Sequence, residues 1–175
     1  MKKLLIISIL IIPFISCEKI DKFTQFTWDI NTTFFIDQDL PTETLIYLEP
    51  QSVFIDNGFF EDYNSSKELI EEAKIKDLFI EMDNPAEANF NFLSDIEIYL
   101  EADGLPKVRI AWKNDIEDLD SQKIKLNFLS DNLAEYLKKD KLKISATIKT
   151  NESLDYPVTI KLKASFFVDA NVMGV

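Results

Sequence analysis

The feature that most restricts the fold of this chain is a long alternation of apolar and polar side chains over residues 158–170, interrupted only by Phe167 on the polar face. Val158, Ile160 and Leu162 begin a series that would face one way, and the polar residues between them would face the other. Side chains alternate between the two faces of a β-strand, whereas a helix repeats about every 3.6 residues. The pattern therefore predicts one long strand, which at about 3.3 Å per residue would cross an entire β-sandwich.

Shorter alternating stretches predict further strands in the rest of the chain. Residues 96–101 and 108–113 are separated by a turn that contains Gly and Pro, so they predict a hairpin. Alternation in the second stretch places Val108, Ile110 and Trp112 in the core and Arg109, Ala111 and Lys113 outside. The other predicted strands are residues 28–36, 45–48, 53–55, 74–82, 124–128 and 141–149.

Two short helices are expected between these strands. Residues 65–73 begin with a serine cap followed by acidic side chains, and residues 131–139 begin with a cap and end in lysines, which suits the helix dipole at both ends. Seven to nine strands with two short helices predict an all-β fold. The expected form is an antiparallel, immunoglobulin-like β-sandwich, and a closed barrel is the alternative.

Composition excludes several classes of function. The 175 residues contain no His, one Cys and three Gly, and 19 basic against 31 acidic residues give a net charge of −12. Without His there is no Ser-His or Cys-His nucleophile system and no His-ligated zinc site. Three isolated glycines form no phosphate-binding loop, so no nucleotide is expected. An acidic chain whose single arginine is Arg109 is also not expected to bind nucleic acid.

The N-terminus has the layout of an export signal. Met1, Lys2 and Lys3 precede an apolar run over residues 4–12, and the only cysteine, Cys17, follows a few residues later. Phe14-Ile15-Ser16-Cys17 resembles the lipobox of bacterial lipoproteins, which implies cleavage before Cys17 and a covalent lipid on its thiol. The expected organisation is a signal peptide over residues 1–16, a lipidated tether over 17–23 and a single β-sandwich domain over 24–175. An ordinary secretory signal or a membrane anchor is the alternative.

The residues after Cys17 add a second resemblance. Glu18-Lys19-Ile20-Asp21 is similar to the charged tether of Bacteroidota-type lipoproteins, although a solvated linker would look the same. The passage over residues 136–141 and the hairpin over residues 148–170 also resemble small lipoproteins of that group. This resemblance implies an uncharacterised outer-membrane lipoprotein, held by its lipid on the periplasmic or the surface-exposed side. Its expected partners are the membrane and other envelope proteins.

One acidic cluster leaves a calcium site open. Hard oxygen ligands at near-alternate positions suit Ca²⁺, but the cluster lacks the Gly of an EF-hand loop, so an acidic turn is the alternative. The candidate ligands are Asp115, Glu117, Asp118 and Asp120. No other cofactor is expected.

The aromatic residues divide into core and surface candidates. Trp28 and Trp112 are in phase with core-facing neighbours, whereas Tyr47 and Tyr99 are surface candidates. A further cluster lies in a predicted loop, and it would be either a partner-contact patch or a plug over one end of the sandwich. Its members are Phe59, Phe60 and Tyr63.

Carboxylates are the only abundant catalytic groups, and nothing in the sequence selects a pair of them. Glu97 and Glu101, for example, lie at outward positions of a predicted strand, where a solvated face is expected. The sequence therefore predicts a non-catalytic, membrane-anchored lipoprotein that acts as a structural or interaction subunit of a cell-envelope assembly. The alternative is an accessory module that binds glycan or Ca²⁺ at a loop end of the sandwich. A carboxylate-dependent hydrolase is a third class.

Overall fold

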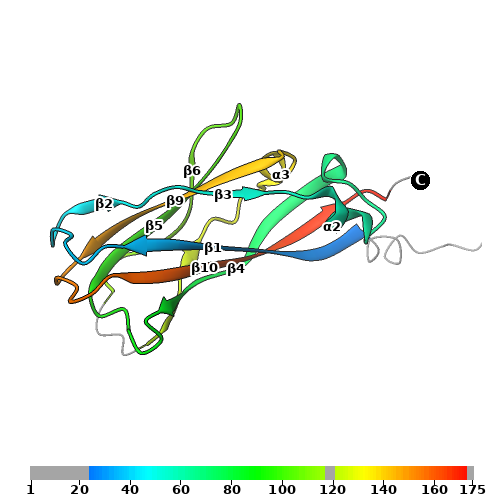
Figure 1. The fold of residues 1–175 in the computed structure, drawn as a ribbon. Coiled ribbons are helices and arrows are strands. Elements are labelled where there is room, and N and C mark those ends of the chain that lie inside the picture. The colour runs from blue at the N-terminus through cyan, green and yellow to red at the C-terminus, as the bar shows by residue number, and fades with distance from the viewer. Residues whose placement is uncertain (1–23, 117–120, 173–175) are drawn as a thin grey trace, which may run out of the picture.

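The computed structural model describes residues 24–116 and 121–172, which form two antiparallel sheets packed face to face (Figure 1). Sheet A contains four strands in the order β1 (Gln25–Ile36), β10 (Val158–Ala170), β4 (Ile70–Asn84) and β7 (Lys123–Lys125). Sheet B contains six, in the order β2 (Leu45–Tyr47), β9 (Lys141–Thr150), β5 (Leu93–Ala102), β6 (Val108–Lys113) and β8 (Asn127–Phe128), with β3 (Gln51–Phe54) also paired to β9. The predicted sandwich is confirmed.

The strand order differs from the immunoglobulin-like type. An immunoglobulin-like sandwich holds its first two strands in one sheet, whereas here β1 and β2 lie in different sheets. The antiparallel pairs are nested: β1 with β10, β2 and β3 with β9, β4 with β7, and β5 with β6. Such nesting is that of one long hairpin wound into two sheets, the arrangement of a jelly roll. The chain forms two separate sheets rather than the closed barrel.

The core lies between the two sheets and follows from the alternation. Every second residue of β10 is buried from Val158 to Ala170, and the residues between them are partly exposed. Phe166 of β10 lies directly opposite Trp28 of β1, with ring centroids 6.2 Å apart. Phe34 and Phe90 are likewise buried completely. These rings pack with the Ile, Leu and Val side chains of both sheets, and the burial of this apolar surface stabilises the sandwich.

Both predicted helices are shorter than expected. In residues 65–73 only a 3₁₀ helix, η1 (Lys67–Leu69), forms, and β4 begins at Ile70. Ile70 and Ala73 are buried and pair with the end of β10, so the sheet outweighs the local helix preference. In residues 131–139 the helix α3 covers Ala134–Leu137. Conversely, residues 57–61, predicted as loop, form the short helix α2 (Asn57–Glu61), capped by the Asp56 carboxylate, which accepts from the Gly58 N–H at 3.0 Å.

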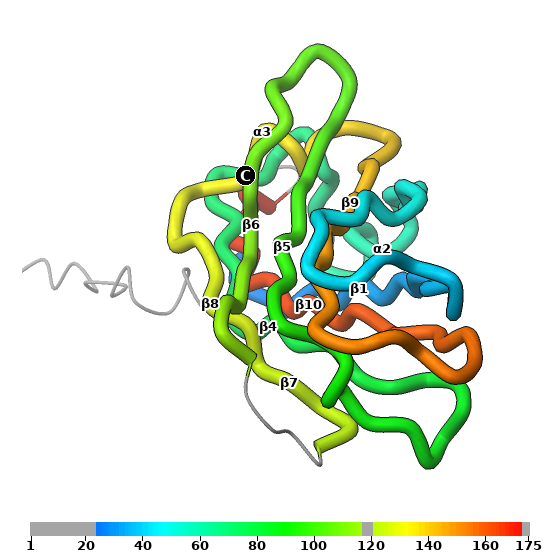
Figure 2. The backbone as a smooth tube through the Cα atoms, turned by 90° about the vertical axis from the view of Figure 1, so that its left-hand side faces the viewer, coloured from blue at the N-terminus to red at the C-terminus, as the bar shows by residue number. Residues whose placement is uncertain are grey.

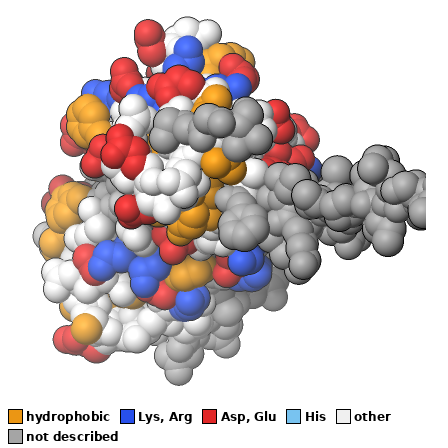
Figure 3. Space-filling model, turned by 90° about the vertical axis from the view of Figure 1, so that its right-hand side faces the viewer, with side chains coloured by type: hydrophobic (Ala, Val, Ile, Leu, Met, Phe, Trp, Pro, Cys, Tyr) orange, Lys and Arg blue, Asp and Glu red, His pale blue; other side chains and the backbone are white. Residues whose placement is uncertain are grey.

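The two ends of the sandwich differ. β1 begins, and the described chain ends, beside α2 (Figure 1). Figure 3 looks onto this end, where acidic, basic and apolar side chains are interspersed. The connections over residues 37–44, 85–92 and 151–157 lie at the opposite end, and the β5–β6 loop projects from the body (Figure 2). Across the two described ranges, no helix is long and apolar enough to cross a bilayer. The predicted signal, tether and Cys17 lie outside the described residues.

Candidate functional site

A β-bulge in β6 changes which side chains face outward. Ile98 lies opposite Ala111 and the next residue of β5, Tyr99, lies opposite Arg109, so Ile110 is the extra residue of β6. Beyond the bulge the alternation is inverted. Ala111 is buried completely, while Trp112 is only half-buried and lies opposite Glu97 on the outer face of sheet B. The predictions that Trp112 faces the core and Ala111 faces outward are therefore wrong, because one inserted residue shifts the phase of the strand.

The outer face of sheet B carries three aromatic side chains within a few strands of each other. The pairing places Tyr47, Thr147, Glu97, Trp112 and Asn127 in one row across β2, β9, β5, β6 and β8. Tyr99 lies two residues further along β5 and therefore on the same face. At about 4.8 Å between neighbouring strands, Tyr47 and Trp112 lie roughly 14 Å apart at the backbone. Tyr47 is 76% exposed, and Tyr99 and Trp112 are partly exposed.

An ion pair lies at the centre of these rings. One Glu97 carboxylate oxygen accepts from Arg109 Nη1 at 2.5 Å, and the other accepts from the Tyr99 hydroxyl, also at 2.5 Å. The Arg109 guanidinium lies 4.7 Å from the centroid of the Trp112 ring, and Lys107 Nζ lies 4.6 Å from that of Tyr99. The charged groups and two of the rings therefore form one connected cluster, whose members restrict each other's rotamers.

These contacts shift two pKa values in opposite directions. The hydrogen bond from Tyr99, reinforced by that from Arg109, lowers the pKa of Glu97 below its ordinary value, against an opposing effect of burial. The same hydrogen bond raises the pKa of the Tyr99 hydroxyl, because its proton is held by a carboxylate. At neutral pH the cluster is therefore a carboxylate, a neutral phenol and a guanidinium.

Small side chains lie between the aromatic residues of β2 and those of β5. The outward residues of β9 are lysines at its two ends and Ser145 and Thr147 in the middle. At the β5–β6 loop end, Lys141 and Lys143 line a shallow hollow of about 370 Å³ together with loop residues such as Gly104. The middle of β9 therefore carries short side chains on this face, and the hollow lies at its Lys141–Lys143 end.

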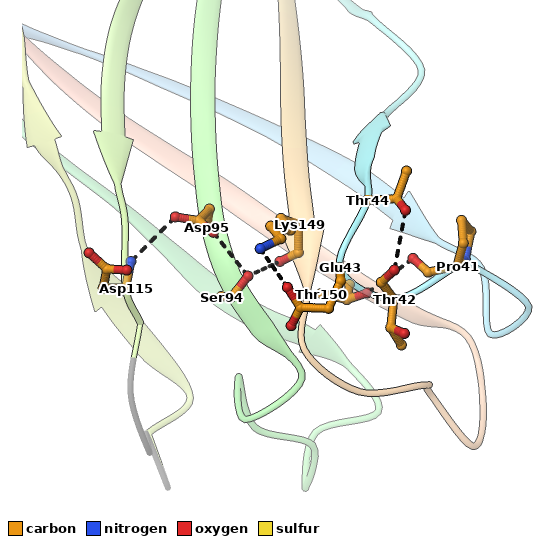
Figure 4. A network of polar contacts seen from close by, with 9 residues as sticks. All are labelled: Pro41, Thr42, Glu43, Thr44, Ser94, Asp95, Asp115, Lys149 and Thr150. Atoms are coloured by element: carbon orange, nitrogen blue, oxygen red, sulfur yellow. Dashed lines mark hydrogen bonds and ion pairs between the residues drawn. The ribbon is translucent and has the colours of Figure 1, made fainter.

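At the opposite end of the face a polar network fixes the loops (Figure 4). Lys149 of β9 forms an ion pair with Glu43 at 2.5 Å, which raises the pKa of the lysine. The Ser94 hydroxyl lies 3.0 Å from Asp95 Oδ2 and 3.1 Å from the backbone carbonyl oxygen of Lys149, and these two acceptors share its proton. Glu43 has a positive φ of 56°, a conformation that costs energy for a residue with a Cβ, and its N–H donates to the Thr150 carbonyl at 2.8 Å.

The proposed calcium ligands are only partly described. Asp115 follows β6, has a φ of 50°, and donates its backbone N–H to Asp95 Oδ1 at 3.3 Å (Figure 4). Glu117, Asp118 and Asp120 lie outside the described residues. Within the described part of the chain, no three side chains of the types His, Cys, Asp and Glu are placed to hold a metal ion.

The cluster of Phe59, Phe60 and Tyr63 packs against the core. Phe60 is buried completely, between Phe26 and Trp28, with centroid distances of 5.9 Å to each ring. Phe59 is partly buried, and Tyr63 stacks on Phe26 at 4.2 Å with 37% of its surface exposed. Phe60 has no surface to offer a partner, so the arrangement favours a plug over this end of the sandwich.

The outer face of sheet A has a different character. Its lysines and carboxylates alternate across the strands in ion pairs, namely Lys161–Asp83 at 2.6 Å, Lys163–Glu81 at 2.5 Å, Lys123–Glu81 at 3.2 Å and Lys125–Asp77 at 2.7 Å. Lys123 Nζ also covers the Phe79 ring at 3.5 Å. Charges that neutralise each other in this way suit a solvated surface. The aromatic residues and polar cluster of sheet B therefore mark the better candidate for a functional surface.

Replacing Glu97 with glutamine should make stability less sensitive to acid. A carboxyl group whose folded pKa is lowered stabilises the fold above its unfolded pKa of about 4.5 and loses this contribution as the pH falls through the folded value. The gap in free energy of unfolding between wild type and Glu97→Gln should be widest near neutral pH and shrink below about pH 4.5. Urea unfolding over a pH series measures it. A gap that does not change with pH would show that folding does not lower the pKa of Glu97.

The sequence identified only part of this face. Tyr47 and Tyr99 were expected at the surface and lie there. Arg109 and Glu97 were expected to face outward, but nothing in the sequence shows that they pair with each other. The one available signal for the bulge is the consecutive apolar pair Ile110-Ala111, which interrupts the alternation of β6. That pair also occurs in strands without bulges, so it does not identify one.

No protein-family model and no curated protein matches the chain. Among solved structures, the chain is similar to one from the X-ray structure of the Triatoma virus empty capsid, with a TM-score of 0.39 and 11% sequence identity. The match covers 87% of this chain and 94% of that chain. Similarity at this level transfers no function, which has to be inferred from the side chains of the site.

Proposed function

We propose that this protein is a lipid-anchored, non-catalytic binding protein of the bacterial outer membrane, acting as an interaction subunit of the cell envelope through the outer face of sheet B. The observation that carries the proposal is the group of partly exposed aromatic rings, Tyr47, Tyr99 and Trp112, around the Glu97–Arg109 pair. Partly exposed aromatic and arginine side chains are enriched at binding surfaces. The lipobox-like Phe14–Cys17 supports the anchor.

The ionisation of the carboxyl groups supports a role without catalysis. A carboxylic acid that donates a proton in catalysis needs a raised pKa. Every described carboxyl group whose pKa is displaced is displaced downward, and each owes this to hydrogen bonds that favour the charged form; these groups are Glu68, Asp77, Glu81, Glu97, Glu135 and Asp140. Such carboxylates suit ion pairing and ligand recognition.

Hydroxyl-radical footprinting of intact envelopes would test the contact surface. Radicals modify aromatic side chains according to their exposure, and mass spectrometry locates the modified residues. Tyr47 and Trp112 should be modified severalfold less in the envelope than in the detergent-purified protein, because a bound partner covers them. Phe35, 62% exposed on the outer face of sheet A, and Tyr156, 44% exposed, serve as controls that should not change.

One footprinting result would contradict the proposed contact surface, and a cysteine variant tests the lipid anchor separately. Protection of Phe35 with Tyr47 left open would place the contact surface on sheet A and overturn the proposal. Cys17 is the only cysteine, so a Cys17→Ala variant removes the single site for a lipid thioether. That variant should leave the membrane fraction after export, and recovery of it with its lipid would contradict the anchor.

A further inference from the structure

We infer that the ligand of this face is a neutral glycan chain, which lies across β2, β9, β5 and β6 against Tyr47, Tyr99 and Trp112 and hydrogen-bonds to Glu97 and Arg109. The inference rests on the proposed function, because it names the ligand of the same surface. Its starting point is the row that runs from Tyr47 over Thr147 and Glu97 to Trp112.

The chemistry of the face matches that of a sugar ring. A pyranose has two apolar C–H faces and a rim of hydroxyl groups, each of which donates and accepts hydrogen bonds. Tyr47, 76% exposed, offers its ring to such a C–H face, whereas the Trp112 and Tyr99 rings each have one face occupied by a cation, at 4.7 and 4.6 Å from their centroids. A guanidinium has five N–H donors and a carboxylate about four acceptor sites. Arg109 uses one donor on Glu97, and Glu97 accepts from Arg109 and Tyr99, so both keep capacity for ligand hydroxyls.

The cluster is ordered before any ligand arrives. Glu97 is held by two hydrogen bonds of 2.5 Å, and Arg109 is held between Glu97 and the Trp112 ring. Binding to such a surface costs little side-chain entropy. This matters for a glycan because each sugar offers only weak individual contacts, so a site that had to order four side chains would lose most of the gain.

The charge of the face suits an uncharged chain. Five basic side chains on it, Lys107, Arg109, Lys141, Lys143 and Lys149, are balanced by five acidic ones, Glu43, Asp95, Glu97, Glu101 and Asp103. The whole chain, by contrast, has a net charge of −12. A nearly neutral face on a strongly acidic protein neither attracts a polyanion nor favours a polycation.

The distribution of polarity argues for a glycan over a protein partner. A protein interface has an apolar centre and a polar rim. Here the centre is polar, with Ser145 and Glu97 partly exposed and Thr147 buried between them, and the most exposed apolar side chains lie to one side, on the edge strands β2 and β3. Those side chains are Leu45, Tyr47 and Phe54. The polar centre fits the hydroxyl groups of a chain that runs across it.

Calorimetry and glycan arrays with the detergent-purified, full-length lipidated protein test the inference. The probes are neutral oligosaccharides, namely cellohexaose, xylohexaose, mannohexaose, maltohexaose and laminarihexaose, with polygalacturonate as the anionic comparison. At least one neutral probe should bind and protect Trp112 from hydroxyl radicals. Its affinity should stay constant over a roughly tenfold change in ionic strength, because screening acts on charges.

Variants identify the side chains involved. Trp112→Ala and Tyr47→Ala should each weaken binding about tenfold or more. Arg109→Lys keeps the charge but loses the planar donor fork, so it should also weaken binding. Phe35→Ala removes an aromatic residue of similar exposure from sheet A and should bind like wild type. Thermal unfolding checks that each variant is folded, which is expected because all four positions are partly exposed.

The outcomes separate this inference from the proposed function. If no neutral probe binds, and protease treatment of the envelopes removes the protection of Tyr47 and Trp112, the partner is a protein and the glycan inference is wrong while the proposed function stands. Binding of polygalacturonate alone, weakened by salt, would also overturn the neutral ligand. Equal weakening by Phe35→Ala would place the site elsewhere, and then both would fail.

Discussion

Replacing Phe166 with alanine should remove about 3–5 kcal/mol from the free energy of unfolding, the usual cost of truncating a buried aromatic residue. Phe166 is 1% exposed, lies on the central strand β10 and packs between Trp28 of β1 and the facing sheet. Its removal leaves a cavity that the paired strands on both sides prevent from collapsing. Because a domain is stabilised by about 5–15 kcal/mol in total, much of the stability would be lost.

The neighbouring residue provides a matched control. Phe167 has the same side chain on the same strand but points to the outer face of sheet A, where it is partly exposed. Phe167→Ala should therefore cost far less than Phe166→Ala. Denaturant unfolding followed by fluorescence gives both values. Equal losses would mean that the two faces of β10 are not assigned as described.

Replacing Ala111 with aspartate should destabilise the protein by about 3–5 kcal/mol or prevent folding, since it leaves an unpaired charge in the core. Ala111 is completely buried opposite Ile98. The loss should shrink as the pH is lowered, because the buried carboxyl group takes up a proton and its folded pKa is raised by burial. Urea unfolding at neutral and at acid pH measures both effects.

Trp112→Asn is the companion variant for the same strand. Asparagine has the size of aspartate but no charge, and a charge at this position would be repelled by Glu97 directly opposite. Because Trp112 lies on the outer face, this change should cost about 1 kcal/mol or less. Simple alternation would reverse the two results, with Ala111→Asp harmless and Trp112→Asn severe. The pair of variants therefore tests the bulge at Ile110 directly.

How far the fold could be predicted depends on where the pattern is regular. The alternation in residues 158–170 correctly gave β10 and its buried face, because every second residue there packs against sheet B. The predicted helix over residues 65–73 was wrong from Ile70 onward, because pairing with β10 decides that segment and no local pattern records it. The order of strands in each sheet could not be predicted for the same reason, because nested pairing joins segments that lie far apart in the sequence.

The candidate site was harder to predict than the fold. Tyr99 on β5 was placed outward by alternation and Tyr47 on β2 was named a surface candidate, but Trp112 was assigned to the core because the sequence does not reveal the bulge. The pairing of Glu97 with Arg109 arises between two strands whose register the same bulge sets. Register is fixed by the packing of the whole sheet, so the site could be recognised only once the strands were aligned.

The nesting of strand pairs also determines the order in which the strands can pair during folding. Gln25 in β1 contacts Asp169 in β10, 144 residues later, and among the strands that the structure describes β1 pairs with β10 alone. The first strand of the domain must therefore wait until nearly the whole chain is available. Folds dominated by such distant contacts fold in milliseconds to seconds rather than microseconds. The hairpin of β5 and β6 carries Glu97, Arg109 and Trp112, and its two strands are close neighbours in the sequence. It can therefore form long before β1 pairs with β10.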